Sequence, residues 1–216
     1  CGLSLGEYTA LCFAGAISFE DGVKITKARG EAMQAASDAS DSGMASIIGL
    51  DAETAAKLCA AAAEATGEPV AIANFLCPGN YACSGASSAV DKVMEIAKPD
   101  FKARMAVKLA VAGAFHTDFM APAVDTLAEV LKGIEVSKPR IPVISNVDAK
   151  PHSDPDTIKS ILTQQVTAPV QWETIMSEMT ANGFEKGYEL GPGKVLAGIM
   201  KRIDKGAAGA MTNVEV

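Results

Sequence analysis

The chain has 216 residues, of which 49% are hydrophobic and 5% aromatic, and its formal net charge at pH 7 is -7. This length and apolar content are enough to bury a substantial core, and many alanines and glycines with few aromatics favour an α/β protein. The negative charge argues against a nucleic-acid partner, because phosphate binding depends on clustered lysine and arginine. No apolar run reaches the roughly 18 residues of a membrane-spanning helix, so no membrane partner is expected.

The first residues suggest a nucleophile. Gly2-Leu3-Ser4-Leu5-Gly6 is a GxSxG pattern, which is typical of a serine on a sharp, strained turn from a strand into a helix. Small residues are needed there because a side chain at either flank would collide with the neighbouring strand or helix. Only Cys1, Gly2 and Leu3 are available for the preceding strand, so we expect the sequence to be truncated at its N-terminus.

Two helices are predicted after this turn. The first runs from Leu5 to about Ala16, and Ser18-Phe-Glu-Asp21 resembles a cap that opens a second helix through about Ala36. A polar loop over 38–43 follows, and the composition changes near Gly43. We therefore expect a boundary there.

The segment from 44 to 110 is predicted to be a small inserted subdomain. Its expected elements are a strand at 45–50, a helix at 52–66, strands at 70–75 and 81–84 joined by a turn at 78–80, a helix at 87–97 and a strand at 103–109. The order βαββαβ is that of a ferredoxin-like unit.

The main domain, residues 1–43 and 111–216, is predicted to be a hydrolase-like parallel-sheet core that is incomplete at its N-terminus. Its later elements are a helix at 122–132, a buried strand at 141–146, a helix at 157–165, a strand at 187–190, a tight turn at 191–193 and a helix at 194–205.

Five cysteines are scattered through mostly apolar stretches. An odd number without metal-ligand spacing favours buried, reduced thiols over disulfides or a metal site, and no cofactor is expected. They are Cys1, Cys12, Cys59, Cys77 and Cys83.

A serine hydroxyl needs a base to take its proton, and the chain has two histidines. His152 lies in a turn-rich polar segment, where a solvent-exposed loop histidine is the expected reading. His116 follows a predicted strand and precedes a helix, a position from which a side chain can enter a pocket. His116 is therefore the candidate base.

Several motifs together resemble one enzyme family. In chain order they are Gly2-Leu-Ser-Leu-Gly-Glu-Tyr-Thr-Ala10, Ala28-Arg-Gly30, Gly113-Ala-Phe-His116, Pro169-Val-Gln-Trp172 and Gly191-Pro-Gly-Lys-Val-Leu196. This series closely resembles the malonyl-CoA:acyl carrier protein transacylases of fatty acid synthesis, and the resemblance spans essentially the whole chain.

The resemblance implies a double displacement. Ser4 would attack the thioester of malonyl-CoA, and the phosphopantetheine thiol of acyl carrier protein would then collect the malonyl group. His116 would act first as general base and then as general acid. The backbone carbonyl of Gln165 would orient His116 in place of a carboxylate, so Asp118 would not be a triad acid. A neutral carbonyl still fixes the tautomer of the histidine, but it stabilises the imidazolium less than a carboxylate does.

The resemblance also assigns substrate contacts. Arg29, with small neighbours on the second predicted helix, would bind the free carboxylate of malonyl bidentately. Phe115 would disfavour an α-methyl branch, although one methyl group is usually worth only about 1 to 3 kcal/mol of discrimination; alternatively, Phe115 is simply pocket lining.

The oxyanion would accept a hydrogen bond from the Leu5 backbone N–H, and in the family a second donor comes from a loop that lies upstream of the position of Cys1. We therefore expect the 216-residue chain expressed alone to be inactive. Leu3 replaces the histidine that many bacterial members carry before the nucleophile, and the motif is most similar to the plastid-type branch of plants and algae, which implies a plastid location.

Five basic residues are candidates to meet the phosphates of coenzyme A and the acidic surface of acyl carrier protein. They are Lys102, Arg104, Lys194, Lys201 and Arg202. Lysines on surface helices are usually just solvated, so the solvated alternative stays open. A monomer is the family-based expectation.

Two other functions remain open from the residues alone. A serine esterase or thioesterase would use the same Ser4 and His116, with Asp100 as the tempting acid. The second is a non-catalytic acyl-carrier binding module, descended from a transacylase and without turnover. Against this alternative, the chain retains all four candidate site residues: Ser4, His116, Arg29 and Gln165.

Overall fold

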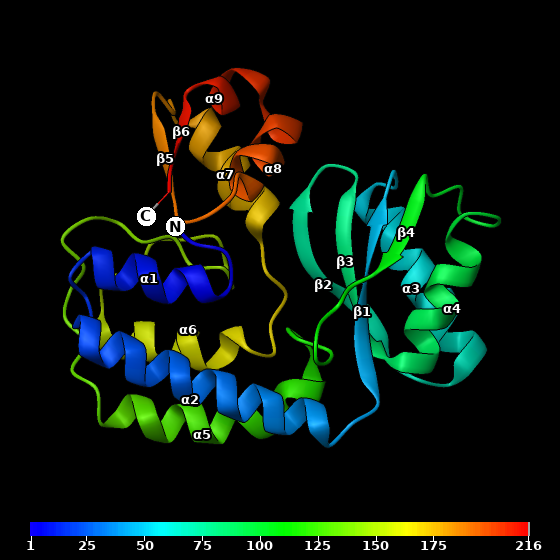
Figure 1. Ribbon diagram of the computed structural model, residues 1–216, viewed down its shortest axis with the longest axis horizontal. Helices are drawn as coiled ribbons and strands as arrows, with labels where there is room; N and C mark the ends of the chain where they lie inside the picture. The colour runs from blue at the N-terminus through cyan, green and yellow to red at the C-terminus, as the bar shows by residue number, and fades with distance from the viewer. Residues whose placement is uncertain (216) are drawn as a thin grey trace.

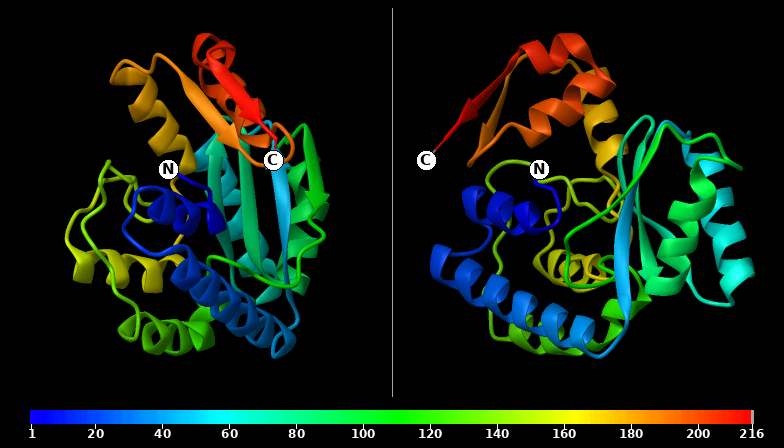
Figure 2. Two further views of the ribbon diagram at one scale, coloured as in Figure 1. Left: turned by 60° about the vertical axis from the view of Figure 1, so that its left-hand side comes forward. Right: turned by 45° about the vertical axis from the view of Figure 1, so that its right-hand side comes forward.

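The computed structural model describes residues 1–215 and has mixed α/β content (Figures 1 and 2). Its helices are α1 (Leu5–Phe13), α2 (Phe19–Asp38), α3 (Ala52–Thr66), α4 (Ser87–Ala97), α5 (Ala121–Lys132), α6 (Pro155–Gln165), α7 (Trp172–Ala181), α8 (Val195–Ile203) and α9 (Lys205–Gly209), with a 3-10 turn η1 (Asp118–Met120). Its strands are β1 (Ser42–Ile48), β2 (Val70–Cys77), β3 (Asn80–Ala86), β4 (Met105–Lys108), β5 (Gly187–Leu190) and β6 (Met211–Val214).

The middle of the chain forms a four-stranded antiparallel sheet in the order β2-β3-β1-β4. The elements follow one another as β1, α3, β2, β3, α4 and β4, which is the order that the sequence predicts. Helices α3 and α4 cover one face of the sheet, where Ala45, Ile47 and Cys83 are buried against them (Figure 1). The other face buries Met44, Ala73 and Ala82. Burial on both faces explains why neither β1 nor β3 carries a charged residue.

A helical layer lies beside this sheet. Helices α1 and α6 pack with α2 and α5 around buried Tyr8, Ile25 and Leu127. The Ser18 hydroxyl accepts a hydrogen bond from the Asp21 backbone N–H at 3.0 Å, so the predicted cap of α2 is confirmed. Helix α1 ends at Phe13, earlier than predicted, because the chain turns at Gly15, whose φ is 71°.

The C-terminal part packs over the edge of β2 (Figure 1). The backbone of Val170 exchanges two hydrogen bonds with β2, to Ala73 at 2.8 Å and from Phe75 at 2.9 Å. Trp172 is buried beneath α8, and β5 and β6 form a parallel pair. This part carries the predicted strand at 187–190, while the single predicted helix at 194–205 is divided into α8 and α9.

The prediction of a buried strand at 141–146 is wrong. Ile144 makes one isolated bridge to Pro151. The Asn146 N–H donates to the Glu7 side chain rather than to the backbone of a neighbouring strand. The prediction of a strand ahead of Ser4 is also not met, since residues 1–3 are irregular. The apolar run predicted burial, but a strand also needs a neighbouring strand, and local sequence does not supply that information.

Ile141, Pro142 and Val143 instead line a cleft of about 520 Å³, together with residues of α1 and β5. No helix within residues 1–215 combines the length and apolarity needed to cross a bilayer.

The cysteine prediction is confirmed in part. All five thiols are free, and Cys59, Cys77 and Cys83 are buried. Cys1 is exposed and Cys12 is half-buried, so the expected burial is wrong for these two. Cys1 lines the open cleft, and Cys12 lies in a groove between α1 and α2 that is also lined by Gly22.

Candidate active site

Ser4 sits on a strained turn immediately before α1. Its φ of 48° and ψ of -102° lie in a region that non-glycine residues rarely adopt. A Cβ added at Gly2 would lie 2.0 Å from the backbone of Gly6, so the predicted need for a glycine at this flank is confirmed. At Gly6 the same prediction is wrong for residues 1–215, among which an added Cβ would meet no atom within 4 Å. Gly6 faces the open cleft, which leaves room for a side chain.

His116 lies opposite Ser4 although the two are far apart in the sequence. Its Nε2 is 2.8 Å from Ser4 Oγ, and its Nδ1 is 2.8 Å from the Gln165 carbonyl oxygen. Because a carbonyl can only accept, Nδ1 carries the proton and Nε2 is free to accept from the serine hydroxyl. The histidine adopts a left-handed φ of 60°, and its N–H donates to Val166 O at 3.1 Å. The Gln165 carbonyl therefore holds the imidazole ring, and the Val166 carbonyl holds the backbone of His116.

The glycine in Gly113-Ala-Phe-His116 has a steric reason. A Cβ at Gly113 would lie 2.4 Å from Ser37 Oγ on α2. The loop before His116 therefore packs directly on that helix. Phe115 is half-buried against two clusters of core residues, and its carbonyl accepts from the Ser84 hydroxyl at 2.9 Å.

Burial lowers the pKa of His116 to about 4, and the nearby Arg29 guanidinium acts in the same direction. The Gln165 carbonyl, which accepts the Nδ1 proton, raises the pKa and offsets part of the effect. The imidazole is therefore neutral near pH 7 and has a free lone pair directed at the serine.

Arg29 reaches the same hydroxyl from α2. Its Nη2 donates to Ser4 Oγ at 2.8 Å and to Gln165 Oε1 at 3.3 Å. The side chain is buried, and its carbon Cζ lies 5.5 Å from the centre of the Tyr8 ring. Its Nε is buried without a hydrogen-bond partner among the described residues. A buried N–H of this kind is costly unless a ligand atom accepts from it.

Two residues of the site were not singled out from the sequence. The Asn146 side-chain oxygen accepts the Ser4 backbone N–H at 2.6 Å, and the buried Glu7 carboxylate accepts from Gln165 Nε2 at 2.6 Å. Burial raises the pKa of Glu7, while the donors from Gln165 and Asn146 lower it and offset part of the effect. A charged residue within a mostly apolar helical turn was the available signal for Glu7, whereas Asn146 has no local signal.

The remaining candidate residues occupy different surroundings. Leu5 is the first residue of α1, and within residues 1–215 its backbone N–H has no acceptor. Asp100 and Asp118 are exposed, and the acceptor at His116 Nδ1 is the Gln165 carbonyl. His152 is not the fully exposed loop histidine that the sequence suggests: its side chain is 22% exposed, and it pairs with Asp148 at 2.9 Å.

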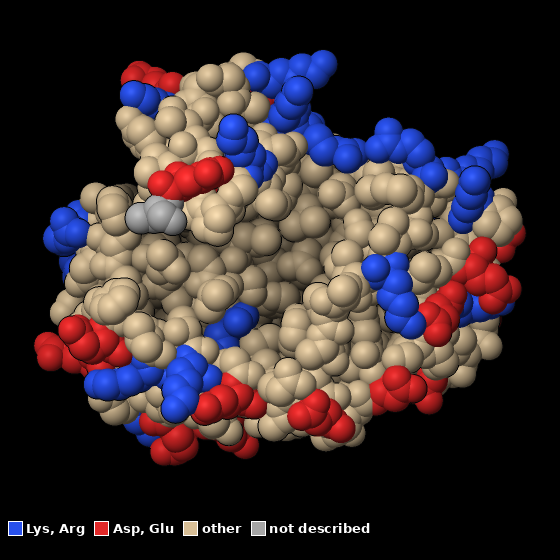
Figure 3. Space-filling model, in the orientation of Figure 1, with Lys and Arg blue, Asp and Glu red and all other residues tan. Residues whose placement is uncertain are grey.

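All five basic candidates are exposed: Lys102, Arg104, Lys194, Lys201 and Arg202. Arg104 packs beside Gly49, and Arg202 lies near Gly79, whose carbonyl accepts from the Gly49 N–H. Arg104 and Arg202 thus lie beside two loops, the one after β1 and the one between β2 and β3, which this hydrogen bond joins. Figure 3 shows Lys and Arg side chains along the upper margin of a hollowed face, between the C-terminal helices and the four-stranded sheet.

The lowered pKa of His116 predicts a pH-dependent loss of stability. Below its ordinary pKa of 6.5 the unfolded chain binds a proton that the folded protein refuses until about pH 4. The free energy of unfolding therefore falls as the pH drops from about 6.5 to 4, by about 2 kcal/mol at pH 5. Urea unfolding at pH 7.5 and pH 5 should show this loss in the wild type and not in His116→Gln. An equal fall in the free energy of unfolding between the two pH values in both proteins would contradict the prediction.

Comparison with known proteins agrees with this geometry. The family model described as "Acyl transferase domain" matches residues 1–213. The malonyl CoA-acyl carrier protein transacylase of Bacillus subtilis is 40% identical over 204 residues, which cover 94% of this chain and 64% of the relative. The chain thus spans less than two thirds of that protein's length. Curated relatives include bacterial and mitochondrial transacylases.

Solved structures show the same likeness. The malonyl CoA-acyl carrier protein transacylase of Coxiella burnetii superposes with a TM-score of 0.93 at 36% identity, covering 98% of this chain and 65% of that one. A malonyl-transacylase in complex with a type II polyketide synthase acyl-carrier protein superposes with a TM-score of 0.89 at 37% identity, covering 99% of this chain and 67% of that one. This chain therefore belongs to the acyl transferase domain family.

Proposed function

We propose that this protein transfers the malonyl group from malonyl-CoA to the phosphopantetheine thiol of acyl carrier protein through a malonyl-Ser4 intermediate, in fatty acid biosynthesis. The observation that carries this function is the position of one serine oxygen, Ser4 Oγ. It lies 2.8 Å from a neutral histidine nitrogen and 2.8 Å from the Arg29 guanidinium. A base and an anion-binding cation meet at one nucleophile.

In the first half-reaction Ser4 Oγ attacks the thioester carbonyl and gives its proton to His116 Nε2. The tetrahedral intermediate collapses as the bond to sulfur breaks, and His116 returns the proton to the leaving coenzyme A thiolate. In the second half-reaction the carrier thiol gives its proton to His116 and attacks the malonyl ester. Ser4 then leaves with that proton, which restores the starting state.

Arg29 would hold the free carboxylate of the malonyl group. Its buried Nε lacks an acceptor among the described residues and its Nη2 already lies at the serine, so these two N–H groups offer the parallel pair that a carboxylate accepts. Leu5 N–H would donate to the oxyanion because it stands free, within residues 1–215, at the start of α1. Phe115, packed in the loop before His116, would limit α-branched acyl groups.

The exposed basic residues would meet the carrier and coenzyme A. Lys102, Arg104, Lys194, Lys201 and Arg202 are all candidates, and the arrangement of basic side chains along one margin (Figure 3) suits an acidic partner. Arg104 and Arg202, which lie beside two loops joined by a hydrogen bond, are the best-placed pair. A relative solved in complex with an acyl-carrier protein supports this choice of partner.

The finer architecture belongs to the same proposal. Residues 1–43 and 111–216 would form a hydrolase-like core, and the parallel pair β5–β6 would belong to its sheet. Residues 44–110, which carry the four-stranded sheet, would be a ferredoxin-like insertion. A monomer follows from the resemblance to the family, and a plastid location from the resemblance of the Gly2–Tyr8 motif to the plastid-type branch.

A transfer assay tests this function. The chain is incubated with radiolabelled malonyl-CoA and acyl carrier protein, both as it stands and behind the N-terminal segment of the Bacillus subtilis relative, since that relative is longer. Label on the carrier that depends on Ser4 supports transfer. Free malonate released without a carrier would instead indicate a hydrolase, and binding of the carrier without any turnover a non-catalytic module.

A further inference from the structure

Glu7 is a buried carboxylate that the reaction above does not use. It stands in the first turn of α1, three residues after the nucleophile, and is 3% exposed. Burying a carboxylate is costly unless nearby donors satisfy it. Its contacts therefore indicate what it does.

One oxygen of Glu7 accepts two hydrogen bonds. Gln165 Nε2 donates to Oε2 at 2.6 Å, and the Asn146 backbone N–H donates to the same atom at 3.1 Å. The two donors come from α6 and from the irregular segment after 141. A single acceptor thus ties two separate parts of the chain to the helix that follows Ser4.

Those two donors are also the residues that hold the reactive pair. Gln165 accepts the His116 Nδ1 proton on its carbonyl oxygen at 2.8 Å, and its side-chain amide donates to Ser4 O at 3.1 Å. Asn146 accepts the Ser4 N–H on Oδ1 at 2.6 Å and donates from Nδ2 to Gly2 O at 2.8 Å. Within residues 1–215, two side chains from outside α1 hydrogen-bond to the backbone of Ser4, those of Asn146 and Gln165. Both of these residues also donate to Glu7.

We propose that Glu7 is the positioning residue of this site: its Oε2 fixes Gln165 and Asn146, and through them the tautomer of His116 and the backbone of Ser4. The role concerns the same site and so rests on the transfer reaction proposed above. It depends on an acceptor at one point in space rather than on negative charge, because both hydrogen bonds end on one oxygen.

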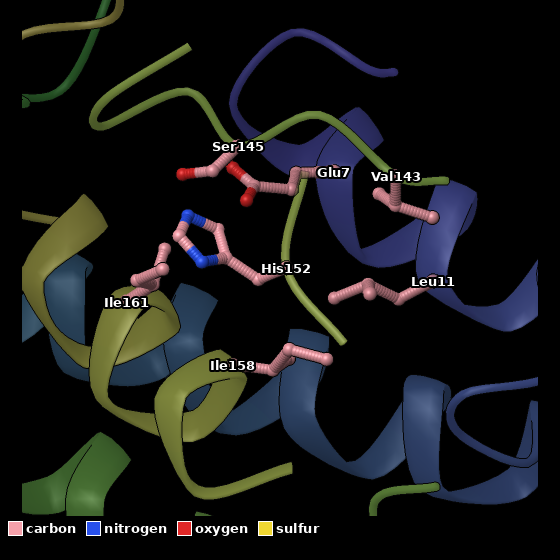
Figure 4. Close-up of a pocket in the computed structure, with 7 residues that line it drawn as sticks. All are labelled: Glu7, Leu11, Val143, Ser145, His152, Ile158 and Ile161. Atoms are coloured by element: carbon pink, nitrogen blue, oxygen red, sulfur yellow. The ribbon is translucent and has the colours of Figure 1, made fainter. Parts of the chain in front are cut away.

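The surroundings of the carboxylate allow charge and acceptor to be separated. Figure 4 shows Glu7 beside Ser145, with the His152 ring facing the same small cavity, which measures about 10 Å³. In Glu7→Gln the amide oxygen can replace Oε2, and the amide nitrogen can point toward the Ser145 hydroxyl, which is able to accept. This variant keeps the acceptor and loses the charge. Glu7→Asp keeps the charge and loses the reach by one methylene, while Glu7→Leu loses both.

The first readout is the tautomer of His116. It is measured by nitrogen NMR on protein labelled with nitrogen-15 at histidine. The chain has only two histidines, so His152→Asn assigns the spectrum. We expect a pure Nδ1–H tautomer in the wild type and in Glu7→Gln, and a mixture in Glu7→Asp and Glu7→Leu. If Glu7→Leu does not fold, Glu7→Asp carries the test. The tautomer does not depend on any thioester, so this readout stands even if the protein proves not to be a transferase.

The second readout is the kinetics of malonyl loading in the form of the protein that is active. Misplacing the base by about 1 Å costs roughly 10- to 100-fold, so kcat should fall by that factor in Glu7→Asp and Glu7→Leu while KM for malonyl-CoA changes little. Glu7→Gln should retain a kcat close to that of the wild type. Glu64→Leu, which changes an exposed glutamate on α3, is the matched control and should leave both readouts unchanged.

Three results would overturn this role. A folded Glu7→Leu or Glu7→Asp with the wild-type tautomer would show that Glu7 does not position His116. A loss in Glu7→Gln as large as in Glu7→Leu would show that charge, not the acceptor, matters. A rise in KM at unchanged kcat would assign Glu7 to substrate binding.

Discussion

Replacing His116 with alanine should lower the rate of malonyl transfer by at least about 10³-fold, which is the usual scale for removing the base of a nucleophile-base pair. His116 Nε2 is within 2.8 Å of Ser4 Oγ, whereas the other histidine is paired with Asp148 on a separate segment. Within residues 1–215, no second base is therefore placed to take the serine proton. Stopped-flow loading with malonyl-CoA measures the effect on the first half-reaction alone.

The control for this prediction is His152→Ala. It removes an imidazole of the same kind and should leave the loading rate nearly unchanged. A His116→Ala protein that is folded and loads at the wild-type rate would mean that the serine proton goes elsewhere. Folding is checked by the same thermal unfolding scan for both variants, since His116 is buried and its loop packs on α2.

Replacing Arg29 with alanine should lower kcat/KM for malonyl-CoA by roughly 10²- to 10³-fold, the scale expected when a buried carboxylate loses its charge partner. With acetyl-CoA, which has no free carboxylate, the loss should be smaller, about 10-fold, and should come from the hydrogen bond that Arg29 gives to Ser4 Oγ. The selectivity for malonyl over acetyl should therefore collapse.

Arg29→Lys sharpens this test. Lysine keeps the positive charge but cannot offer two parallel N–H groups in one plane, so malonyl selectivity should recover only in part. Competition between malonyl-CoA and acetyl-CoA in one reaction gives the selectivity directly. Equal losses for both thioesters in Arg29→Ala would assign Arg29 to the serine rather than to the substrate carboxylate.

Much of the fold follows from short-range patterns. The Ser18 cap, the turn at 78–80 and the alternation of strands and helices between 44 and 110 are each encoded within a few residues, and the structure has them where the sequence predicts. The meeting of Ser4 with His116 spans 112 residues. The position of His116 made it the candidate base, and the resemblance to a known family supported its pairing with Ser4. Patterns that act locally are readable without that help.

Other features depend on partners that no local pattern names. The apolar run at 141–146 predicts a strand, yet its neighbours are the cleft and the Glu7 side chain, so it remains irregular. Helix α7 begins after Gln171, which makes no side-chain cap, and therefore had no start signal. Strand β6 is four residues long and exists through its pairing with β5. The role of Glu7 cannot be predicted from its own segment, because only the fold brings Gln165 and Asn146 to its carboxylate.

The most direct test of acyl transfer through Ser4 is the intact mass of the protein after brief mixing with malonyl-CoA, performed on the chain and on its fusion behind the N-terminal segment of the Bacillus subtilis relative. We predict a single malonyl adduct that is absent in Ser4→Ala and that disappears when acyl carrier protein is added, with the malonyl mass moving to the carrier. An adduct that persists in Ser4→Ala, or a malonylated carrier formed without any adduct on a rapid-quench timescale, would contradict a serine-bound intermediate.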